Sequence, residues 1–498
     1  MSQKTSRIQI RPTIDQRVAV SVVYVAALFM SIMDVTIVNV ALPTIGRQFH
    51  VTTTSVDVIV IGYLVSLAVV IPASGWIGDR FGAKRTLLLA ILIFTGASAL
   101  CGTASSLTQL VIFRVLQGVG GGMLTPVGMS MLYRTFPPSD RVRLASILVT
   151  PTAFAPAIGP VLGGLLVSDL SWRWVFYVNV PIGAVACMFG LLFVKEHREL
   201  RPGRFDLGGF CLAGLGLGLL MYGVSEGPDK GWSSPQIVIT ITAGLLLLAA
   251  MVIIERRVAQ PMVHLRLFGD RLFRACNELI FVTMVGIFGV LFVVPLYYQD
   301  GRGLSALGSG LSTFPEALGV MIGAQVVSRV LYPAFGPRRV MASGSIGIAI
   351  FTAAMALCGA HSSLWWMRII VLGLGYSASH MIVSLQASAF TTITPASTGQ
   401  ASALFNANRQ LGAAIGVAIL STIISVVGPV HHFGATIVPN LTAYHAAFLT
   451  ASAIALAGGA LALAAVRDED ASATRSSRRR GTAHGSAEEQ HALIVTSD

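Results

Sequence analysis

Long apolar stretches separated by short polar segments recur along the whole chain. A helix rises about 1.5 Å per residue, so about 20 apolar residues can cross the ~30 Å hydrocarbon core of a bilayer. The pattern predicts an all-α polytopic membrane protein with fourteen spans. The predicted spans are 18–42, 56–76, 86–103, 107–133, 144–167, 173–194, 207–225, 236–254, 275–298, 305–328, 340–360, 364–386, 402–427 and 443–466.

Two polar segments at corresponding positions share a pattern, which indicates an internal repeat. Residues 75–85 follow the second span and residues 329–339 follow the tenth, and each contains Phe-Gly, one further residue and two basic residues. Asp79 of the first segment is replaced by Pro333 in the second. We therefore expect two parallel six-helix bundles joined by an inserted pair of helices. The expected divisions are a tail at 1–17, a bundle at 18–200, the hairpin at 201–257, a bundle at 258–466 and a disordered tail at 467–498.

The charges are few and unevenly placed. Only 11% of the residues are charged and 54% are hydrophobic, against about 25% charged residues in soluble domains. The net charge of +12 does not indicate a nucleic-acid partner, because 27 of the 34 Lys and Arg residues fall in both tails and in alternate loops. Four fall in the opposite loops and three within spans. The positive-inside rule then predicts a cytoplasmic-membrane protein with both termini in the cytoplasm and basic loops near anionic lipid.

Several chemistries have no sequence support. No G-x-x-x-x-G-K-[ST] motif is present, so we do not expect ATP hydrolysis to drive this protein. The five cysteines lie in or beside predicted spans without a metal-ligand spacing, and His431 and His432 lack neighbouring ligands. The sequence therefore predicts no cofactor, no metal and no enzymatic activity.

The first span carries a carboxylate at Asp34, and the fourth carries a guanidinium at Arg114. An ionised side chain in hydrocarbon costs about 2.5–3.5 kcal/mol on insertion scales, so such residues usually serve a function. Asp34 lies about 12 Å from the outer end of its span and Arg114 about 10 Å from the same side. Two opposite charges at one depth can form a proton-coupling pair or a static structural pair, and the sequence leaves both alternatives open.

Other polar and aromatic positions give weaker signals. Glu316 follows Pro315 about 17 Å into the tenth span, where it suits a proton or cation site or a structural hydrogen bond. Glu278 lies near the inner end of the ninth span, where it can simply reach the interface. The candidate lining of an apolar substrate pocket is Phe154, Phe314, Glu278, Asn408 and Arg409, each of which can instead make ordinary helix contacts.

Five segments carry a family resemblance. The first span contains Met-Asp-Val-Thr-Ile-Val-Asn-Val-Ala-Leu-Pro, and residues 75–85 contain Gly-Asp-Arg-Phe-Gly-Ala-Lys-Arg. Arg-Val-Leu-Gln-Gly-Val-Gly begins at Arg114, Gly-Pro-Val-Leu-Gly-Gly begins at Gly159, and Trp-Arg-Trp-Val-Phe-Tyr-Val-Asn-Val-Pro-Ile-Gly begins at Trp172. Together they resemble the fourteen-helix drug:proton antiporters of the major facilitator superfamily (the QacA/EmrB type). The fifth-helix signature departs at Ala155, where the family has glycine.

The resemblance implies proton-driven export of amphipathic compounds by alternating access, by a chain able to function as a monomer. Proton coupling is expected at Asp34, Arg114 and Glu316, although Glu316 belongs to none of the general signatures. The expected conformational latch is Gly75, Asp79, Arg80, Gly82, Lys84 and Arg85, and the expected antiporter motif is Gly159, Pro160, Gly163 and Gly164.

The expected partners are a small amphipathic substrate, protons and the lipid bilayer. The predicted outer loops are too short to span a periplasm, so crossing a second membrane would need a periplasmic adaptor and an outer-membrane channel. Two alternatives stay open, namely a secondary transporter or importer dedicated to one metabolite, and a non-transporting membrane sensor on the same scaffold.

Overall fold

The computed structural model describes residues 14–51, 56–197, 204–258, 261–433 and 436–474, and these are almost entirely helical. The first helical set comprises α1 (Gln16–Phe49), α3 (Val58–Phe81), α4 (Ala83–Thr103), α5 (Leu107–Thr135), α6 (Arg141–Thr152), α7 (Phe154–Asp169), α8 (Trp174–Tyr177) and α9 (Asn179–Phe193). Two linking helices follow, α10 (Leu207–Lys230) and α11 (Pro235–Glu255). The second helical set comprises α12 (Arg271–Leu296), α13 (Ala306–Val326), α14 (Tyr332–Met355), α15 (Leu364–Ser388), α16 (Thr398–Val427) and α17 (Leu441–Ala465).

Helix formation follows from the apolar stretches, because backbone groups in hydrocarbon must be satisfied within the same segment. Polar side chains then fix several helix starts. Ser106, Asp206, Asp270 and Ser305 each precede a helix and accept a hydrogen bond from the backbone N–H three residues later. Such caps satisfy one of the four free N–H groups at a helix start.

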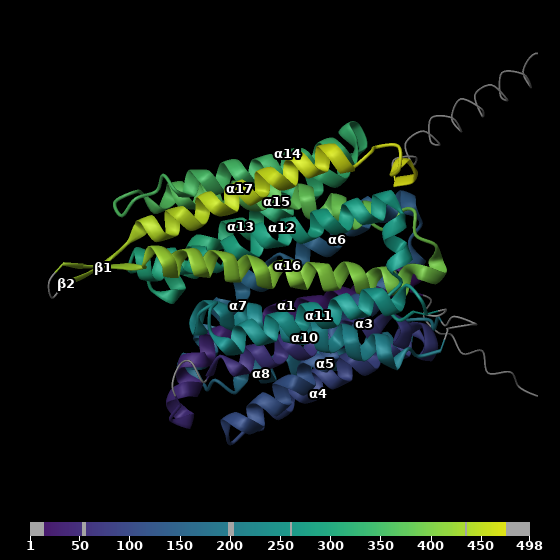
Figure 1. Ribbon diagram of the computed structural model, residues 1–498, viewed down its shortest axis with the longest axis horizontal. Coiled ribbons are helices and arrows are strands. Elements are labelled where there is room, and N and C mark those ends of the chain that lie inside the picture. Colours follow the sequence, from purple (N-terminus) through teal and green to yellow (C-terminus); the bar gives the residue numbers. More distant parts are fainter. Residues whose placement is uncertain (1–13, 52–55, 198–203, 259–260, 434–435, 475–498) are drawn as a thin grey trace, which may run out of the picture.

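The two helical sets repeat one packing scheme. In the first set, α3 and α4 pack on α5, and α1 packs on α7 and α9. In the second set, α13 and α14 pack on α15, and α12 packs on α16 and α17. Figure 1 shows the second set in the upper part of the molecule and most of the first set in the lower part. Helix α10 contacts both α3 and α16, and α11 packs on α10.

The two sets also share a turn. Gly82 separates α3 from α4 with φ 102°, and Gly336 breaks α14 with φ 78°, a region that side chains rarely adopt. After Gly82, the backbone N–H of Lys84 donates to Glu196 just beyond α9. After Gly336, the backbone N–H of Arg338 donates to Asp468 just beyond α17. A carboxylate following the last helix of each set therefore caps the helix that follows this turn.

The helices overlap every predicted span, with three differences. The described residues hold thirteen helical stretches long and apolar enough to cross a membrane, because 307–355 is one stretch of 49 residues. At 1.5 Å per residue it would be about 74 Å long, more than twice the hydrocarbon thickness. The segment 329–339, expected as a loop between two spans, is mostly helical, since a π-helical turn at Val327–Leu331 carries α13 into α14, but the chain breaks within it at Gly336. The segment 75–85 is likewise helical apart from Gly82.

Two further departures concern extramembrane segments. A short antiparallel hairpin pairs β1 (Val430–Phe433) with β2 (Thr436–Pro439), which an all-α prediction did not include. Residues 467–474 were assigned to the disordered tail, but Ala471 and Thr474 are buried and Thr474 Oγ1 lies 2.8 Å from the Tyr332 hydroxyl. The rest of the expected tail, 475–498, and most of the expected tail 1–17 lie outside the described residues.

Both ends of the described chain lie at one end of the helical bundle. Arg17, at the start of α1, forms an ion pair with Asp140 at 3.0 Å. Asp140 belongs to a short turn, η1 (Pro138–Asp140), that contacts η6 (Ser472–Thr474) near the described carboxyl end. An even number of membrane crossings between the two ends is consistent with this placement.

Close helix packing generates the first prediction. A Cβ on Gly120 would lie 2.6 Å from the Phe94 backbone nitrogen, whereas a Cβ on Gly96 would meet nothing within 4 Å. Overpacking costs about 1–3 kcal/mol, so Gly120→Val should lower the Tm of detergent-purified protein by several degrees. Gly96→Val is the matched control and should leave Tm nearly unchanged. An equal Tm for both variants would show that α4 and α5 do not require this close approach.

Candidate functional site

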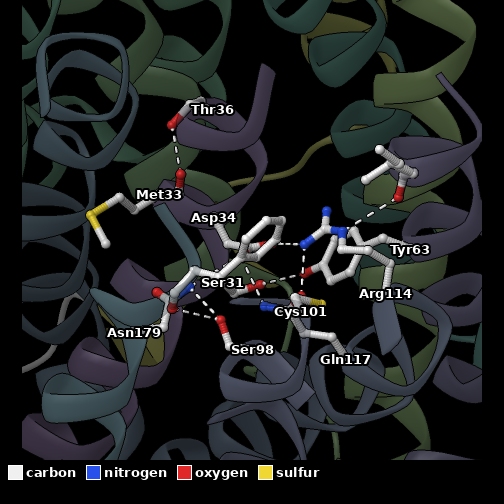
Figure 2. A network of polar contacts seen from close by, with 12 residues as sticks. Ser31, Met33, Asp34, Thr36, Tyr63, Ser98, Cys101, Arg114, Gln117 and Asn179 are labelled. Carbon is white, nitrogen blue, oxygen red and sulfur yellow. Dashed lines mark hydrogen bonds and ion pairs between the residues drawn. The ribbon is translucent and has the colours of Figure 1, made fainter. Parts of the chain in front are cut away.

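Asp34 lies at the centre of a buried polar network inside the first helical set (Figure 2). Its carboxylate accepts hydrogen bonds from Arg114 Nη1 at 2.5 Å, Gln117 Nε2 at 2.8 Å and Asn179 Nδ2 at 3.1 Å. All four side chains have 0% exposure to solvent. The structure thus brings Asp34 and Arg114 together as an ion pair without water access.

Four helices supply this network. Asp34 comes from α1, Arg114 and Gln117 from one face of α5, and Asn179 from the start of α9. Ser98 of α4 links the network outward, because it accepts from Asn179 Nδ2 at 3.1 Å and donates to the Phe176 carbonyl at 2.9 Å. Arg114 Nη1 also donates to Gln117 Oε1 at 2.8 Å, so the guanidinium and the amide both hold the carboxylate.

The guanidinium of Arg114 has further contacts that fix its position. Its Nε donates to the Ile59 carbonyl at 3.3 Å, and its central carbon lies 4.4 Å from the centre of the Tyr63 ring. The Tyr63 hydroxyl lies 3.3 Å from Ser31 Oγ. Arg114 Nη2 is buried without a hydrogen-bond partner in the described part of the chain, so its two N–H groups are left for another acceptor.

The energetics of this pair make the charge state of Asp34 consequential. A buried ion pair tolerates desolvation only while both charges are present, and losing one partner costs about 3–5 kcal/mol. Protonation of Asp34 would leave the Arg114 charge without its counter-charge in a dry site. Relief requires a rearrangement of α1 relative to α5, or a new anion beside Arg114.

Sequence reasoning missed Gln117, Ser98 and Asn179 as members of this site. Gln117 follows Arg114 by three residues, and Asn179 lies inside the segment that begins at Trp172. Helical spacing offered a signal for Gln117, since residues three apart share a face. No sequence signal places Ser98 near Asn179, because only the packing of α4 on α9 brings them together.

The expected antiporter motif lies against α1 beside Asp34. A Cβ on Gly159 would overlap Thr36 Oγ1, and a Cβ on Gly163 would lie 3.0 Å from the Ile37 side chain. Pro160 is half-buried between them, and a Cβ on Gly164 would meet nothing within 4 Å. Two of the three glycines therefore serve the close packing of α7 on α1, one turn from the ion pair.

Asp79, from the expected latch, lies where the two helical sets meet. It forms an ion pair with Arg134 at 2.8 Å, and Arg134 Nε donates to the Pro395 carbonyl of the second set at 3.0 Å. A Cβ on Gly75 would lie 2.6 Å from the Gly399 carbonyl oxygen, at the first turn of α16. Gly75 and Asp79 thus hold α3 directly against α16.

The remaining latch residues contact their own set. Lys84 Nζ donates to the Leu191 carbonyl at 2.8 Å, and Arg85 lies 3.6 Å from Glu196. Gly82 provides the turn between α3 and α4, while Arg80 is exposed. The expected latch therefore divides into a part that touches the second set and a part that caps α4.

Further contacts close this end of the molecule. The Tyr133 hydroxyl donates to the Gln386 carbonyl at 2.5 Å, and the Tyr133 ring stacks on Phe390 at 4.3 Å. Arg141 Nη1 donates to the Phe390 carbonyl at 2.6 Å. We call these contacts, with those of Asp79 and Gly75, the inter-set joint. The joint lies at the same end of the bundle as Arg17 and η6.

The candidate pocket residues do not form one cluster. Phe154 of α7 and Phe314 of α13 face each other across the two sets, with ring centres 6.1 Å apart. Asn408 donates to Asn277 of α12 at 3.0 Å. Glu278 is exposed in a surface recess beside Arg271 and Arg274 near the start of α12.

Glu316 is half-buried on α13, and no hydrogen bond or ion pair joins its carboxylate to any other described residue. Arg409 is half-buried on α16, and its Nε is likewise without a partner within the described ranges. The structure therefore separates a paired site in the first set from unpaired charges in the second.

Comparison with known proteins identifies the family. The Major Facilitator Superfamily profile matches residues 24–417. A protein named multidrug resistance protein B homolog from Mycobacterium tuberculosis is 33% identical over 409 residues, covering 81% of this chain and 75% of the relative. A putative multidrug resistance protein MdtD from Pectobacterium atrosepticum is 30% identical over 409 residues, covering 81% of this chain and 86% of the relative.

Solved structures agree on the fold. The human organic anion transporter MFSD10 (TETRAN) superimposes with a TM-score of 0.66 at 14% identity, covering 90% of this chain and 99% of that one. The proton:xylose symporter XylE superimposes with a TM-score of 0.61 at 14% identity, covering 89% of this chain and 94% of that one. With the match over residues 24–417 and the repeated helical sets, the chain is a multi-pass membrane transporter that belongs to the Major Facilitator Superfamily.

Proposed function

We propose that this protein exports amphipathic drugs or related toxic compounds across the cytoplasmic membrane in exchange for protons. The observation that carries the proposal is the fully buried Asp34–Arg114 pair, the kind of titratable centre that a proton-driven cycle requires. Relatives named as multidrug resistance proteins, at 30–33% identity over 81% of the chain, support drugs as the substrate class.

We further propose fourteen spans of the QacA/EmrB type, arranged as two six-helix bundles with α10 and α11 as an inserted hairpin. The 49-residue stretch 307–355 is long enough for two spans, and Gly336 breaks its second half. The excess of Lys and Arg in the tails and alternate loops supports a cytoplasmic position for the end that carries the joint. The described conformation is then the one closed toward the cytoplasm.

The proposed cycle follows from the charge of the Asp34 carboxylate. In the closed state, Asp34 is ionised and held by Arg114, Gln117 and Asn179. A proton arriving from outside neutralises Asp34 and weakens its hold on α5, which favours separation of the helical sets at the inter-set joint. Substrate then binds from the cytoplasm, the proton leaves inward, and the re-formed ion pair favours closure. Alternating access of this kind needs no contact between proton and substrate.

The second prediction tests the proton carrier. Asp34→Asn keeps the shape and hydrogen-bonding capacity of the side chain but cannot release a proton. Wild-type protein in proteoliposomes should accumulate an amphipathic dye in response to a pH gradient, and the Asp34→Asn variant should show no accumulation above empty liposomes. Asp57→Asn makes the same chemical change at the outer start of α3 and is the control. Gradient-driven uptake at the wild-type rate by the Asp34→Asn variant would eliminate Asp34 as an obligatory carrier.

The third prediction tests the joint. Asp79→Ala removes the partner of Arg134, and a charged hydrogen bond is worth about 1.5–3 kcal/mol. The ratio of closed to open protein should therefore shift by about 10- to 100-fold, slowing turnover while leaving expression and Tm close to wild type. Cysteine accessibility at the cytoplasmic end should rise in parallel. Asp140→Ala, which removes an exposed ion pair at the same end, should change neither. A wild-type transport rate for the Asp79→Ala variant would contradict the latch hypothesis.

The fourth prediction tests whether the Glu316 carboxylate makes the protein prefer cationic substrates. A carboxylate near the middle of the membrane offsets the desolvation of a bound cation and offers a neutral compound no such gain. Glu316→Gln should weaken resistance to cationic dyes by roughly 10-fold and resistance to neutral drugs by far less. The control is Glu226→Gln, which changes a carboxylate already paired with Lys230 at 2.6 Å. Equal losses for cationic and neutral compounds at equal protein level would favour a structural role.

A further inference from the structure

One face of α16 carries a row of polar side chains, each with one buried atom that lacks a partner in the described part of the chain. Ser402 Oγ, Asn406 Oδ1 and Arg409 Nε are buried atoms that no other described residue satisfies. Ser402 and Asn406 are 0% and 1% exposed. The three residues lie at spacings of four and three, which places them within about 60° of one another around the helix. We call them the α16 stripe.

The α16 stripe faces the first helical set. Asn406 Nδ2 lies 3.6 Å from Met129 Sδ of α5. Gly399 lies three residues before Ser402 on the same face and contacts Gly75 and Asp79 of α3. Tyr24 of α1 lies within electrostatic range of Arg409. The stripe therefore begins immediately behind the inter-set joint and runs toward the middle of the membrane.

The charge of Arg409 has no counter-charge among the described residues. It lies eleven residues into α16, about 17 Å from the helix start and thus near the bilayer midplane. No carboxylate within the described ranges pairs with it, and a guanidinium at such depth costs about 2.5–3.5 kcal/mol on insertion scales. Helical side chains lean toward the amino terminus of their helix, so we expect the guanidinium to lie on the side of α16 that leads to Asn406, Ser402 and the joint.

We propose, resting on the efflux function above, that Arg409 binds the carboxylate of an amphipathic substrate, with Asn406 and Ser402 lining its path from the cytoplasm. Arg409 supplies charged donors that suit a carboxylate, and Ser402 supplies a hydroxyl. Asn406 Oδ1 accepts a donor group elsewhere on the substrate. Separation at the joint would uncover this stripe to the cytoplasm, so an incoming acid meets Ser402 first and Arg409 last.

The contrast with the first set supports the assignment. Arg114 is matched there by Asp34, whereas Arg368 of α15 has a Ser312 hydroxyl at 3.4 Å. Arg409 alone among these three intramembrane arginines has neither a charge partner nor a hydrogen bond within the described residues. A substrate carboxylate would supply the missing negative charge beside Arg409. The half-buried Glu316 could then pair with the positive group of a zwitterionic substrate.

The experiment uses a pair of dyes that differ at one group. Rhodamine 110 has a free carboxyl group, and rhodamine 123 is its methyl ester. We expect Arg409→Gln to weaken binding of rhodamine 110 to purified full-length protein by about 10- to 100-fold, measured by fluorescence polarisation. Binding of rhodamine 123 should change by less than about 3-fold. Arg409→Lys, which keeps the charge, should recover part of the rhodamine 110 affinity.

Controls separate this inference from the efflux proposal. Arg368→Gln removes another half-buried intramembrane arginine and should leave the ratio of the two affinities unchanged. Equal weakening of both dyes by Arg409→Gln, or no weakening of either, would overturn carboxylate recognition while gradient-driven transport of rhodamine 123 still supports efflux. Wild-type protein that transports neither dye against a pH gradient would overturn the efflux proposal, and this inference with it.

Discussion

A charge pair sealed from water is the constraint on which the rest of the first helical set depends. The Asp34–Arg114 contact of 2.5 Å lies where neither side chain has any exposure, so each charge is tolerated only because the other is present. Gln117 and Asn179 complete the hydrogen bonding of the carboxylate and so commit α5 and α9 to fixed positions. The geometry of the bundle and the charge of one carboxylate are therefore linked.

Close helix approach makes that sealing achievable. Gly159 and Gly163 let α7 lie directly on α1 beside the pair, where Cβ atoms would crowd Thr36 and Ile37. Gly120 lets α5 lie on the backbone of α4. Helices in lipid lack a hydrophobic driving force for association. Close van der Waals packing at small residues stabilises their contacts instead. Two glycines of the expected antiporter motif, Gly159 and Gly163, thus hold α7 against α1 within one turn of Asp34.

The sequence predicted the elements well and their contacts only in part. Apolar length predicted ranges that described helices overlap, and the repeated Phe-Gly segment marked the two positions where the structure turns, at Gly82 and Gly336. Depth along a helix was enough to pair Asp34 with Arg114, because both distances start from the same membrane face. Sequence had no means to find Ser98, which reaches Asn179 only through the packing of α4 on α9.

The division of the expected latch shows a second limit of predicting side-chain contacts from sequence. Asp79 faces α16 while Arg85 faces Glu196, although the two residues are six positions apart and looked like one cluster. A single glycine with a positive φ reverses the chain between them. Backbone direction at one residue therefore decided which side chains meet the second set. Pattern alone does not encode this direction.

Helix α1 offers a physical route between the two kinds of charge. It holds Asp34 beside Arg114 in the first set, and about 15 Å along the same helix it carries Tyr24, which lies within electrostatic range of Arg409 of α16. Motion of α1 away from α5 on protonation would thus also change the surroundings of the unpaired guanidinium. Binding of an anion at Arg409 would in turn bias the position of α1 and the affinity of Asp34 for its proton, since such coupling is reciprocal. Exchange of proton for substrate then needs one shared rigid helix rather than one shared site.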